Sequence, residues 1–369
     1  MVRLIDIIKK NLKKSSVSED PLTSFSSVSA PVPELKSVQE KSFRKKNQPK
    51  PKAAATSSAI PVVTGDALKE VYMSVFYTVK AAVDQVVLKD KIEEAVAKVA
   101  DVFEGEPYSR MLLMSYSFSQ KSYLTAHITN DVVLTVAFAS FLGFDREDVI
   151  GLGTCALCHD LGMTHFEGIS KKGQQLTQQE IEDIKQHPLR SAEIVRPVFA
   201  ERISSVVMDV HERENGQGYP RGIPGAEIHL WAKIIAVVDT FEALTHPRVF
   251  RSVYSPYEAI KIIIKKKDIL FDDMVVKRFI DFMSIYPVGS LVNLNSGEVA
   301  IVTGSNAASP TRPVVRVILN ENREVEEGDN FIDLSGKEFI YITGVVAQDK
   351  EKEFLYYLKP LGQVDLDEA

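Results

Sequence analysis

The sequence predicts a mainly α-helical protein made of three parts. These are a disordered basic N-terminal segment (residues 1–62), an all-helical domain (63–285) and a small β-barrel or β-roll domain (286–369). Apolar side chains recur at helical spacing through the second part, which predicts helices. After Pro287 the period falls to two, with short β-branched runs between turn residues, which predicts strands. The first part is rich in Ser, Pro, Lys and Ala and has too few large apolar side chains to offset the entropy cost of folding.

Turn and cap residues divide the helical part into successive helices. Gly162 ends the helix that contains the two cysteines. Pro188 lacks a backbone N–H and is expected to break or kink the helix around it. The expected helices cover residues 66–87, 90–104, 107–120, 123–142, 145–158, 177–199, 202–211, 230–244, 256–267 and 272–283. The expected strands cover residues 290–294, 299–303, 314–319, 330–334 and 339–346.

Charge is distributed unevenly along the chain. Residues 1–60 contain 12 Lys and Arg against 5 Asp and Glu, although the 369-residue chain has a formal net charge of -6. The folded part is therefore acidic, which argues against a nucleic-acid partner, because such a partner requires a basic surface. Residues 1–14 place Leu4, Ile5, Ile8 and Leu12 on one helical face, with lysines beside them. This pattern is typical of a helix associated with a membrane surface or a partner, or of a frayed terminal helix, which composition favours.

Several features predict a cytoplasmic protein. The chain has no run of about 18 apolar residues, so no membrane-spanning helix is predicted. Its N-terminus lacks the apolar core and cleavage site of a signal peptide. Cys155 and Cys158 are too few for a disulfide framework. With His159 they match the spacing of c-type haem attachment, but that requires export, so we expect both cysteines to pack as small apolar side chains.

Histidines and aspartates recur on otherwise apolar helical segments, where their burial is costly unless they are paired or bind a metal. The candidate ligands, in chain order, are His127, His159, Asp160, His187, His211 and Asp239. The remaining histidines, His165, His229 and His246, are expected to be polar residues of the surface or of loops. A series of such residues favours a metal centre over independent core hydrogen bonds.

Imidazole and carboxylate ligands together suit Fe, Mn or Zn better than Ca or Mg. Six residues can hold two metal ions if one carboxylate bridges them. Asp160 is the natural bridge, because it adjoins His159 at the end of one helix. Two metal ions about 4 Å apart can share a hydroxide nucleophile and offset charge on a phosphoryl oxygen. The ligand pattern therefore indicates phosphoester hydrolysis.

The same residues resemble the HD phosphohydrolase superfamily, in the set His127, His159-Asp160 and Asp239. His187 with its proline, the segment His211-Glu212-Arg213, Gly218-Tyr219-Pro220, and the Thr-Phe-Glu-Ala-Leu-Thr run after Asp239 are similar to its HD-GYP branch. That branch comprises bacterial phosphodiesterases that act on cyclic di-GMP. The resemblance covers about residues 120–265 and implies an HD-type helical domain with two divalent transition metal ions, Fe or Mn. It implies that His159 and Asp160 are catalytic as well as metal ligands.

The resemblance also implies where substrate binds. Arg248 and Arg251 would hold the phosphates of cyclic di-GMP or a related cyclic dinucleotide as guanidinium forks. Gly218, Tyr219 and Pro220 would contact the substrate or a diguanylate cyclase-type signalling partner. A loop that only supports the metal site is the competing interpretation of these three residues.

Some positions depart from the family pattern. The family usually has Lys where Met163 stands, His where Val210 stands and, in members with three metals, an acidic ligand where Tyr123 stands. These changes remove charged groups around the extra metal and the substrate phosphate. Two hypotheses remain: a two-metal phosphodiesterase with a reduced outer shell, or a degenerate domain that binds nucleotide, metal or a protein partner without catalysis. A metal-free scaffold is a third.

Overall fold

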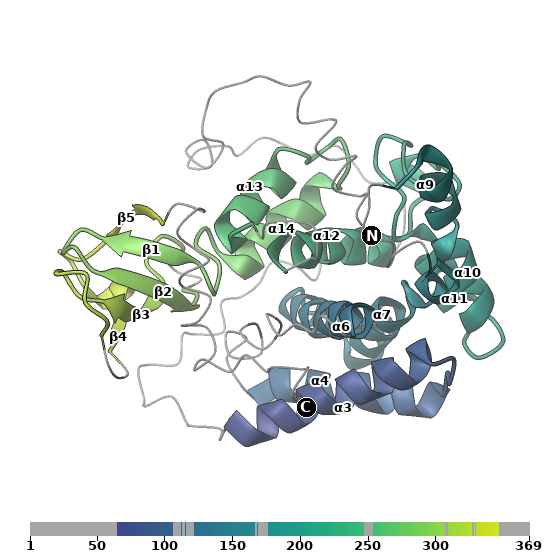
Figure 1. The fold of residues 1–369 in the computed structure, drawn as a ribbon, viewed down its shortest axis with the longest axis horizontal. Coiled ribbons are helices and arrows are strands. Elements are labelled where there is room, and N and C mark those ends of the chain that lie inside the picture. Colours follow the sequence, from purple (N-terminus) through teal and green to yellow (C-terminus); the bar gives the residue numbers. More distant parts are fainter. Residues whose placement is uncertain are drawn as a thin grey trace.

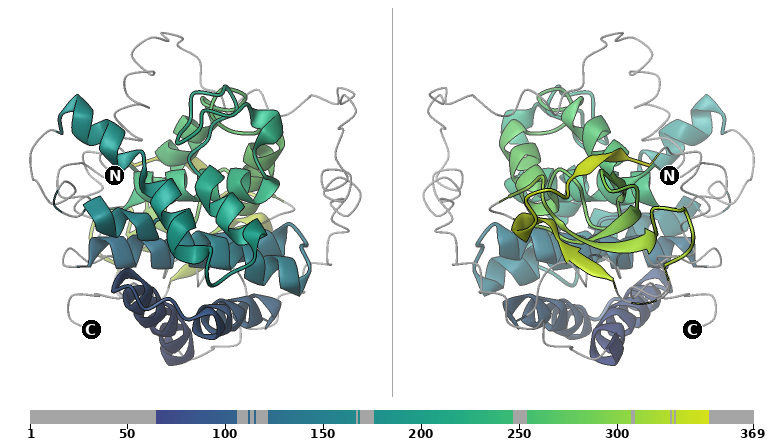
Figure 2. Two further views of the ribbon diagram at one scale, coloured as in Figure 1. Left: turned by 90° about the vertical axis from the view of Figure 1, so that its right-hand side faces the viewer. Right: turned by 90° about the vertical axis from the view of Figure 1, so that its left-hand side faces the viewer.

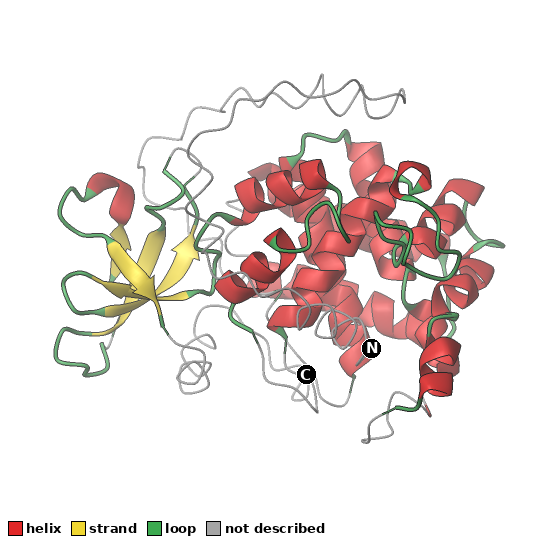
Figure 3. Ribbon diagram, turned by 90° about the horizontal axis from the view of Figure 1, so that it is seen from above, coloured by secondary structure: helices red, strands yellow, loops and turns green. Residues whose placement is uncertain are grey.

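A computed structural model describes residues 65–105, 112, 115, 122–166, 168, 176–246, 254–306, 309–326, 328 and 330–346. The N-terminal segment expected to be disordered, most of the helix expected at 107–120, and both Arg248 and Arg251 lie outside these residues. Helices and strands occupy separate ends of the molecule (Figure 1), and the view from above shows the same separation (Figure 3). The mainly helical fold with a following β region is confirmed. The proposed domain boundaries stay predictions.

The helical part surrounds two central helices, α6 (Tyr123–Phe141) and α7 (Arg146–Cys158), which pack against each other. The first described helices, α3 (Gly65–Val83) and α4 (Lys89–Gly105), cover one side of this pair, and α12 packs against α6 on another (Figure 1). The remaining helices are α9 (Gln178–Ile184), α10 (His187–Val195), α11 (Glu201–Asp209), α12 (Leu230–Thr245), α13 (Pro256–Ile264) and α14 (Asp273–Met283), with a 3-10 turn η2 (Leu161–Phe166) after α7. Helices α9 to α11 lie at the end opposite the sheet (Figure 2).

Local sequence explains where several of these helices begin. The Asp145 carboxylate caps α7 by accepting a hydrogen bond from the Asp148 N–H at 3.0 Å. Thr177 opens α9 with a capping box that it forms with Glu180. Pro188 lies in the first turn of α10, where its missing N–H costs nothing. The helix expected at 177–199 is therefore divided in two, as Pro188 predicted.

Helix α6 is buried almost all round, as expected of a core helix with apolar residues on every face. It is a described helix that is long and apolar enough to cross a membrane, and 83% of the tested stretch is buried inside the protein. Core helices pass the same test of length and composition. Because α6 packs against α3, α4, α7 and α12, polar side chains on it face protein rather than solvent.

The β region forms a five-stranded antiparallel sheet in the described residues, in the order β4-β3-β2-β1-β5. The strands are β1 (Leu291–Leu294), β2 (Val299–Gly304), β3 (Val314–Leu319), β4 (Phe331–Asp333) and β5 (Ile342–Val345). Alternating side chains make two apolar clusters, one containing Leu291 and Ile301 and the other Val292 and Val302. Within the described residues the sheet is open, with β4 and β5 at its edges, so the expected strands are present without a closed barrel.

Candidate metal centre

Five helical segments bring the six sequence-predicted ligands to one place. Helix α6 carries His127, the end of α7 carries His159 and Asp160, α10 begins with His187, His211 follows α11, and Asp239 lies in α12. All six side chains are buried, with at most 5% of each residue exposed. Residues that span more than 100 positions of sequence therefore converge inside the helical part.

Asp160 lies between the histidines. Its Oδ1 is 3.0 Å from His187 Nε2, 3.3 Å from His211 Nε2 and 3.5 Å from His159 Nε2. Its Oδ2 is 3.6 Å from His127 Nε2. The Oδ1 atom of Asp239 lies 3.4 Å from His127 Nε2, and its Oδ2 lies 3.8 Å from His211 Nδ1. Oδ1 of Asp160 thus faces the side of the cluster with His187 and His211, and Oδ2 faces the side with His127. A bridging ligand requires this arrangement.

A seventh side chain, Asp131, lies in the cluster and was not predicted. Its Oδ2 is 3.3 Å from His127 Nε2 and 3.7 Å from His159 Nε2, and the residue is fully buried. Asp131 stands one helical turn after His127 on an apolar helix, so the argument that identified the other ligands applied to it equally. Asp131 was not predicted because the family pattern has an acidic ligand one turn before His127, not one turn after it.

The arrangement of the ligand atoms suits metal binding better than it suits hydrogen bonding among the side chains themselves. His159 Nδ1 bonds the Ala156 carbonyl at 2.7 Å and His187 Nδ1 bonds the Ile184 carbonyl at 2.8 Å, which directs each Nε2 into the cluster. Within the described chain, the buried Nε2 atoms of His127, His159 and His187 have no hydrogen-bond partner. His127, Asp131, His159 and Asp239 each offer a ligand atom within 4.8 Å of the others, and so do His159, Asp160 and His211. Imidazole with carboxylate is a donor set for divalent transition metal ions.

Electrostatics also favour cation binding. Burial opposes ionisation of Asp160, but His159 and His187 outweigh it and hold the pKa of this carboxyl well below its usual value. The pKa of Asp239 is likewise lowered, by His127 and His211, against the effect of burial. Burial and the nearby His187 lower the pKa of His211 to about 4. Ionised carboxylates and a neutral imidazole are the forms that bind metal ions.

A hydrogen-bonded chain behind His127 orients its ring. The Glu242 carboxylate bonds His127 Nδ1, so that His127 Nε2 points into the cluster. Asn130 Nδ2 donates to Glu242 Oε1 at 3.1 Å, and the buried Tyr72 hydroxyl of α3 donates to Asn130 Oδ1 at 2.7 Å. A carboxylate behind a ligand histidine is the usual support of a metal site. Glu242 was predicted only as part of the family motif, and its role in orienting His127 was not predicted.

Gly162 lets α10 approach the turn that carries Asp160. A Cβ atom at this position would lie 2.1 Å from the His187 carbonyl oxygen and 2.6 Å from the Ser191 nitrogen. The Gly162 N–H also donates to Ser191 Oγ at 2.8 Å. The glycine two residues after Asp160 therefore sets the position of His187 as well as the end of the helix.

The Gly218-Tyr219-Pro220 loop packs directly on two of the ligands. The Tyr219 ring stacks on His211, with centroids 5.1 Å apart, and lies 5.9 Å from the His187 ring. Glu212 fixes the loop, because its carboxylate accepts hydrogen bonds from the backbone N–H groups of Arg221 at 2.7 Å, Gly222 at 3.1 Å and Ile223 at 3.2 Å. The structure places the loop beside the site and gives it a supporting role; contact with substrate stays a proposal.

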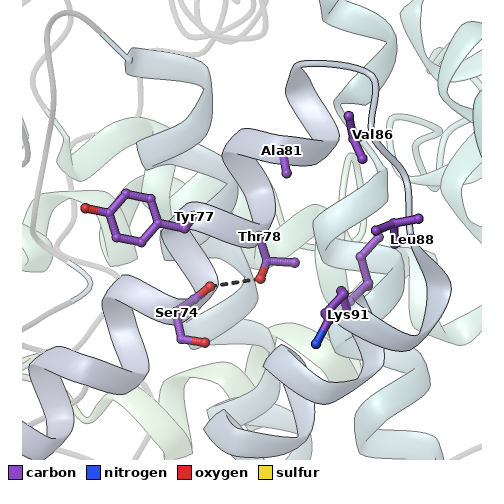
Figure 4. A pocket seen from close by; sticks show the side chains of 8 residues that line it. Ser74, Tyr77, Thr78, Ala81, Val86, Leu88 and Lys91 are labelled. Carbon is purple, nitrogen blue, oxygen red and sulfur yellow. Dashed lines mark hydrogen bonds between the residues drawn. The ribbon is translucent and has the colours of Figure 1, made fainter.

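A separate groove lies between α3 and α4 (Figure 4). It has a volume of about 410 Å³, and its lining includes Tyr77, Val86, Leu88 and Lys91. The lining contains none of the predicted site residues. The groove is therefore distinct from the buried cluster.

Comparison with known proteins places this cluster in a family. Residues 114–275, which contain all seven side chains, match the family described as an HD domain, and residues 291–354 match a KOW domain associated with HD domain. A cyclic di-GMP phosphodiesterase of Pseudomonas aeruginosa is 30% identical over 258 residues, which are 69% of this chain and 60% of that protein. The resemblance to the HD-GYP branch of HD domain proteins that the motifs predicted is thus confirmed for the helical part of the chain.

Two further curated proteins and one solved structure are similar to parts of this chain. The cyclic di-GMP phosphodiesterase PdeB of Borreliella burgdorferi is 26% identical over 56% of this chain and 55% of that protein. The 3'3'-cGAMP-specific phosphodiesterase 1 of Vibrio cholerae is 36% identical over 42% of this chain and 37% of that protein. An HDG"Y"P protein of Bdellovibrio bacteriovorus has a solved structure that covers 59% of this chain and 68% of its own, with 18% identity and a TM-score of 0.44. The chain spans between a third and three fifths of the curated HD-GYP relatives named here.

The positions predicted to depart from the HD-GYP pattern have two kinds of surroundings. Met163 lies in a small apolar cluster with Leu176 and Ile184. Val210 is fully buried in the main core. Tyr123 is partly buried, and its ring lies parallel to the His127 ring, 6.0 Å away. Met163 and Val210 therefore contribute apolar packing, whereas Tyr123 stacks beside a candidate ligand.

The histidines outside the cluster have three different settings. His165 is exposed, as expected. His229 is half-buried and caps α12 by accepting a hydrogen bond from the Trp231 N–H at 3.1 Å. His246 was predicted to be a polar surface or loop residue. It lies outside α12 as its C-cap, but it is only 4% exposed, and its ring nitrogens contact the carbonyls of Glu242 and Ser115. Its position at the end of a core helix buries it.

Proposed function

We propose that the protein is a metal-dependent phosphodiesterase that hydrolyses cyclic di-GMP or a related cyclic dinucleotide at a binuclear metal centre. The observation that carries this proposal is the convergence of six buried imidazole and carboxylate side chains, His127, His159, Asp160, His187, His211 and Asp239. All of them except Asp160 have a buried nitrogen or oxygen atom without a hydrogen-bond partner in the described residues. The names of the relatives supply the substrate class.

Bound divalent ions supply a water activated at neutral pH and positive charge opposite a phosphoryl oxygen. The chain itself holds and orients those ions. Asp160 faces both halves of the cluster and is the proposed bridge, with His159 beside it. Glu242 and the backbone carbonyls behind the histidines keep the imidazole nitrogens directed inward.

Around that centre, the Gly218-Tyr219-Pro220 loop orients His211 and His187 and forms one wall of the site. We propose that this wall also contacts the nucleotide. Arg248 and Arg251, which lie outside the described residues, are proposed to hold phosphate charge. Fe and Mn are the proposed metals, because they accept mixed nitrogen and oxygen ligands.

A second candidate function rests on a specific observation. Met163 is buried in an apolar cluster where the family has a lysine, so no cation stands there to stabilise charge on the reacting phosphate. A domain that binds metal and nucleotide but turns over slowly or not at all, as a signalling or protein-interaction module, fits this substitution. Association with a diguanylate cyclase-type protein belongs to this proposal.

The test is a metal and activity measurement on the full chain, purified without oxygen. Metals per chain are counted, and cyclic di-GMP and 3'3'-cGAMP are each incubated with the protein and added Mn²⁺ or Fe²⁺. About two metals per chain with linear dinucleotide or mononucleotide product supports the phosphodiesterase. Two metals and nucleotide binding without product supports the second candidate, and a protein free of metal contradicts both.

We propose a cytoplasmic location, and the state of the two cysteines supports it. Both cysteines are free and fully buried in α7, and burial raises the pKa of each thiol. They pack as apolar side chains, as expected, and away from solvent. The proposed peripheral membrane or partner role of residues 1–14 falls outside the described residues.

A further inference from the structure

Asp131 is a fully buried carboxylate with no compensating hydrogen bond. Neither of its oxygens has a hydrogen-bond partner among the residues that the structure describes, and the residue is 0% exposed. An isolated ionised carboxylate is among the most costly groups to bury. A positive charge beside the ionised carboxylate would offset that cost.

The histidine beside it cannot supply the whole offset. His127 Nε2 lies 3.3 Å from Asp131 Oδ2, 3.4 Å from Asp239 Oδ1 and 3.6 Å from Asp160 Oδ2. A single Nε2–H donates one hydrogen bond and cannot satisfy three carboxylates. A cation accepts several oxygen and nitrogen ligands at once, and its charge offsets several carboxylates together.

We propose that Asp131 is a metal ligand that completes a four-residue donor set with His127, His159 and Asp239. This inference rests on the metal centre of the proposed function and extends it by one residue. The four ligand atoms lie within 4.8 Å of one another, and all four residues are buried. The ion that this donor set would bind is a divalent transition metal ion.

The position of Asp131 on α6 explains how it joins the set. Residues four apart on a helix lie on the same face, so Asp131 and His127 project toward the same point. Tyr123, one turn before His127, instead lies parallel to the His127 ring. On α6 the carboxylate, Asp131, therefore lies one turn after His127 rather than one turn before it.

Asp131 also changes the character of the donor set. With it, the set has two imidazoles and two carboxylates, and the second carboxylate adds one negative charge. More oxygen ligands and more negative charge favour harder cations such as Mn²⁺ over softer ones. We therefore expect this residue to contribute to both the affinity and the selectivity of metal binding.

The experiment compares the wild-type chain with Asp131→Asn by Mn²⁺ titration against a chelating dye and by thermal unfolding with and without Mn²⁺. Asn has nearly the same shape but no charge. In metal-free protein the variant should unfold at a higher temperature than wild type, because the Asn amide can donate a hydrogen bond inside a cluster rich in carboxylates, whereas Asp adds a further carboxyl group to it. With Mn²⁺ the order should reverse, and the Mn²⁺ dissociation constant should increase by about tenfold or more.

Thr135→Val is the matched control. Thr135 lies one further turn along α6, is also 0% exposed, and its hydroxyl also has no partner in the described residues. Val removes that buried polar group without touching the donor set. This variant should change the unfolding temperature by the same amount with and without Mn²⁺ and leave the dissociation constant unchanged.

A second measurement covers the case in which Asp131→Asn does not fold. An anomalous difference map from wild-type crystals grown with Mn²⁺ should place an ion about 2.2 Å from an Asp131 oxygen. A folded Asp131→Asn with wild-type Mn²⁺ affinity, or an ion that leaves Asp131 uncoordinated, overturns this inference while the proposed function stands. A wild-type chain that binds no Mn²⁺ overturns both.

Discussion

At the scale of single residues, His127 shows how the centre is supported. One ring nitrogen bonds Glu242, and the other faces the carboxylates of the cluster. Burial disfavours the protonated ring, but the charges of Glu242 and Asp131 outweigh burial and raise the pKa of His127 well above its ordinary value. Carboxylates thus lie on both sides of the ring. Removing the Glu242 carboxylate at Nδ1 should therefore weaken metal binding at Nε2.

Glu242→Gln tests that support. The amide keeps the shape of Glu242 but loses the charge that orients His127 and makes it a better ligand. Loss of a supporting carboxylate typically weakens metal binding about 10–100-fold. Mn²⁺ titration should therefore show a larger dissociation constant at an unchanged number of sites. Tyr72→Phe, which removes the far end of the same hydrogen-bonded chain, should have a smaller effect in the same direction, and no effect from either variant would contradict the role given to Glu242.

Asp160→Ala tests the proposed bridge. Because both oxygens of Asp160 face ligand histidines, its loss should disrupt both halves of the donor set. We expect metal content to fall from about two ions per chain to less than one, measured by elemental analysis after anaerobic purification. Asp183→Asn, at a partly exposed position of α9, is the control and should keep full metal content. A variant without Asp160 that still holds both ions would show that it does not bridge.

The residue types of the centre could be predicted from sequence, and some of its members could not. Six ligands were predicted because histidine and aspartate on apolar helices need partners, and the structure brings all six together. Asp131 could have been predicted, because it lies one turn after His127 on the same apolar helix, but the expected family pattern has an acidic ligand one turn before that histidine. Glu242 was missed because the contact between α6 and α12 depends on helix packing. The burial of His246 was missed for the same reason: whether a residue at a helix end is buried depends on what packs over that end.

At the scale of elements, the loop after His211 depends on a close backbone approach. A Cβ atom on Gly218 would lie 2.4 Å from the Glu212 Cα and 2.5 Å from the Arg213 nitrogen. Both neighbours are backbone and cannot rotate away. The Tyr219 N–H donates to the His211 carbonyl at 3.2 Å, so displacement of the loop would also move the ring that stacks on His211.

Gly218→Ala should therefore destabilise the protein by about 2 kcal/mol, the usual cost of forcing an atom into a packed site. Urea unfolding of metal-free protein measures this. Gly336→Ala is the control, because a Cβ atom there would meet nothing within 4 Å, and it should change the free energy of unfolding by well under about 1 kcal/mol. Equal effects from the two variants would mean that the loop relaxes without cost.

The start of α12 is predicted to make stability depend on pH. Burial and the positive charge of Arg202 lower the pKa of His229 to about 4. The unfolded chain has a His pKa of about 6.5, so it binds the proton that the folded chain rejects between these values. Stability is therefore full above about pH 6.5 and is lost as the pH falls toward about 4.

His229→Asn should reduce this loss, since Asn can also cap a helix but does not titrate. Because His229 is only half-buried and partly screened by solvent, we expect the difference between variant and wild type to be about 1 kcal/mol at pH 5 and near zero at pH 7.5. Chemical unfolding at the two pH values measures it. A variant whose stability falls as steeply as that of wild type would assign the pH dependence to other groups.

Most elements could be predicted from local pattern. Helices α6, α7, α12 and α14 and the strands lie close to the expected ranges, because periodicity and caps are local properties. The division between α9 and α10 followed from Pro188. The open sheet did not follow from the strand pattern, because the same alternation suits an open sheet and a closed barrel.

At the scale of the whole molecule, the candidate metal centre joins distant parts of the helical domain. Its side chains come from α6, α7, α10, α12 and the segment after α11. The cluster without cations contains carboxylates close together, which repel one another. Bound ions should therefore stabilise the entire helical part rather than one loop.

Metal removal tests this. Ligands that bind only the folded state stabilise it by about 2.7 kcal/mol when they are present at a hundredfold excess over their dissociation constant. Treatment with a chelator should therefore lower the unfolding temperature by at least about 5 °C, and Mn²⁺ should restore it. Differential scanning fluorimetry measures both steps. An unchanged unfolding temperature after confirmed metal loss would show that the centre does not hold the domain together.

Sequence alone predicts which segments are helices or strands and which histidines and aspartates are candidate metal ligands. These predictions follow from periodicity, capping and the cost of burying charge, all of which act along the chain. Tertiary packing sets Glu242 against His127, stacks Tyr219 on His211 and leaves the strands in an open sheet. Those outcomes depend on how helices and strands pack across more than 100 residues of sequence, and no local pattern encodes that geometry.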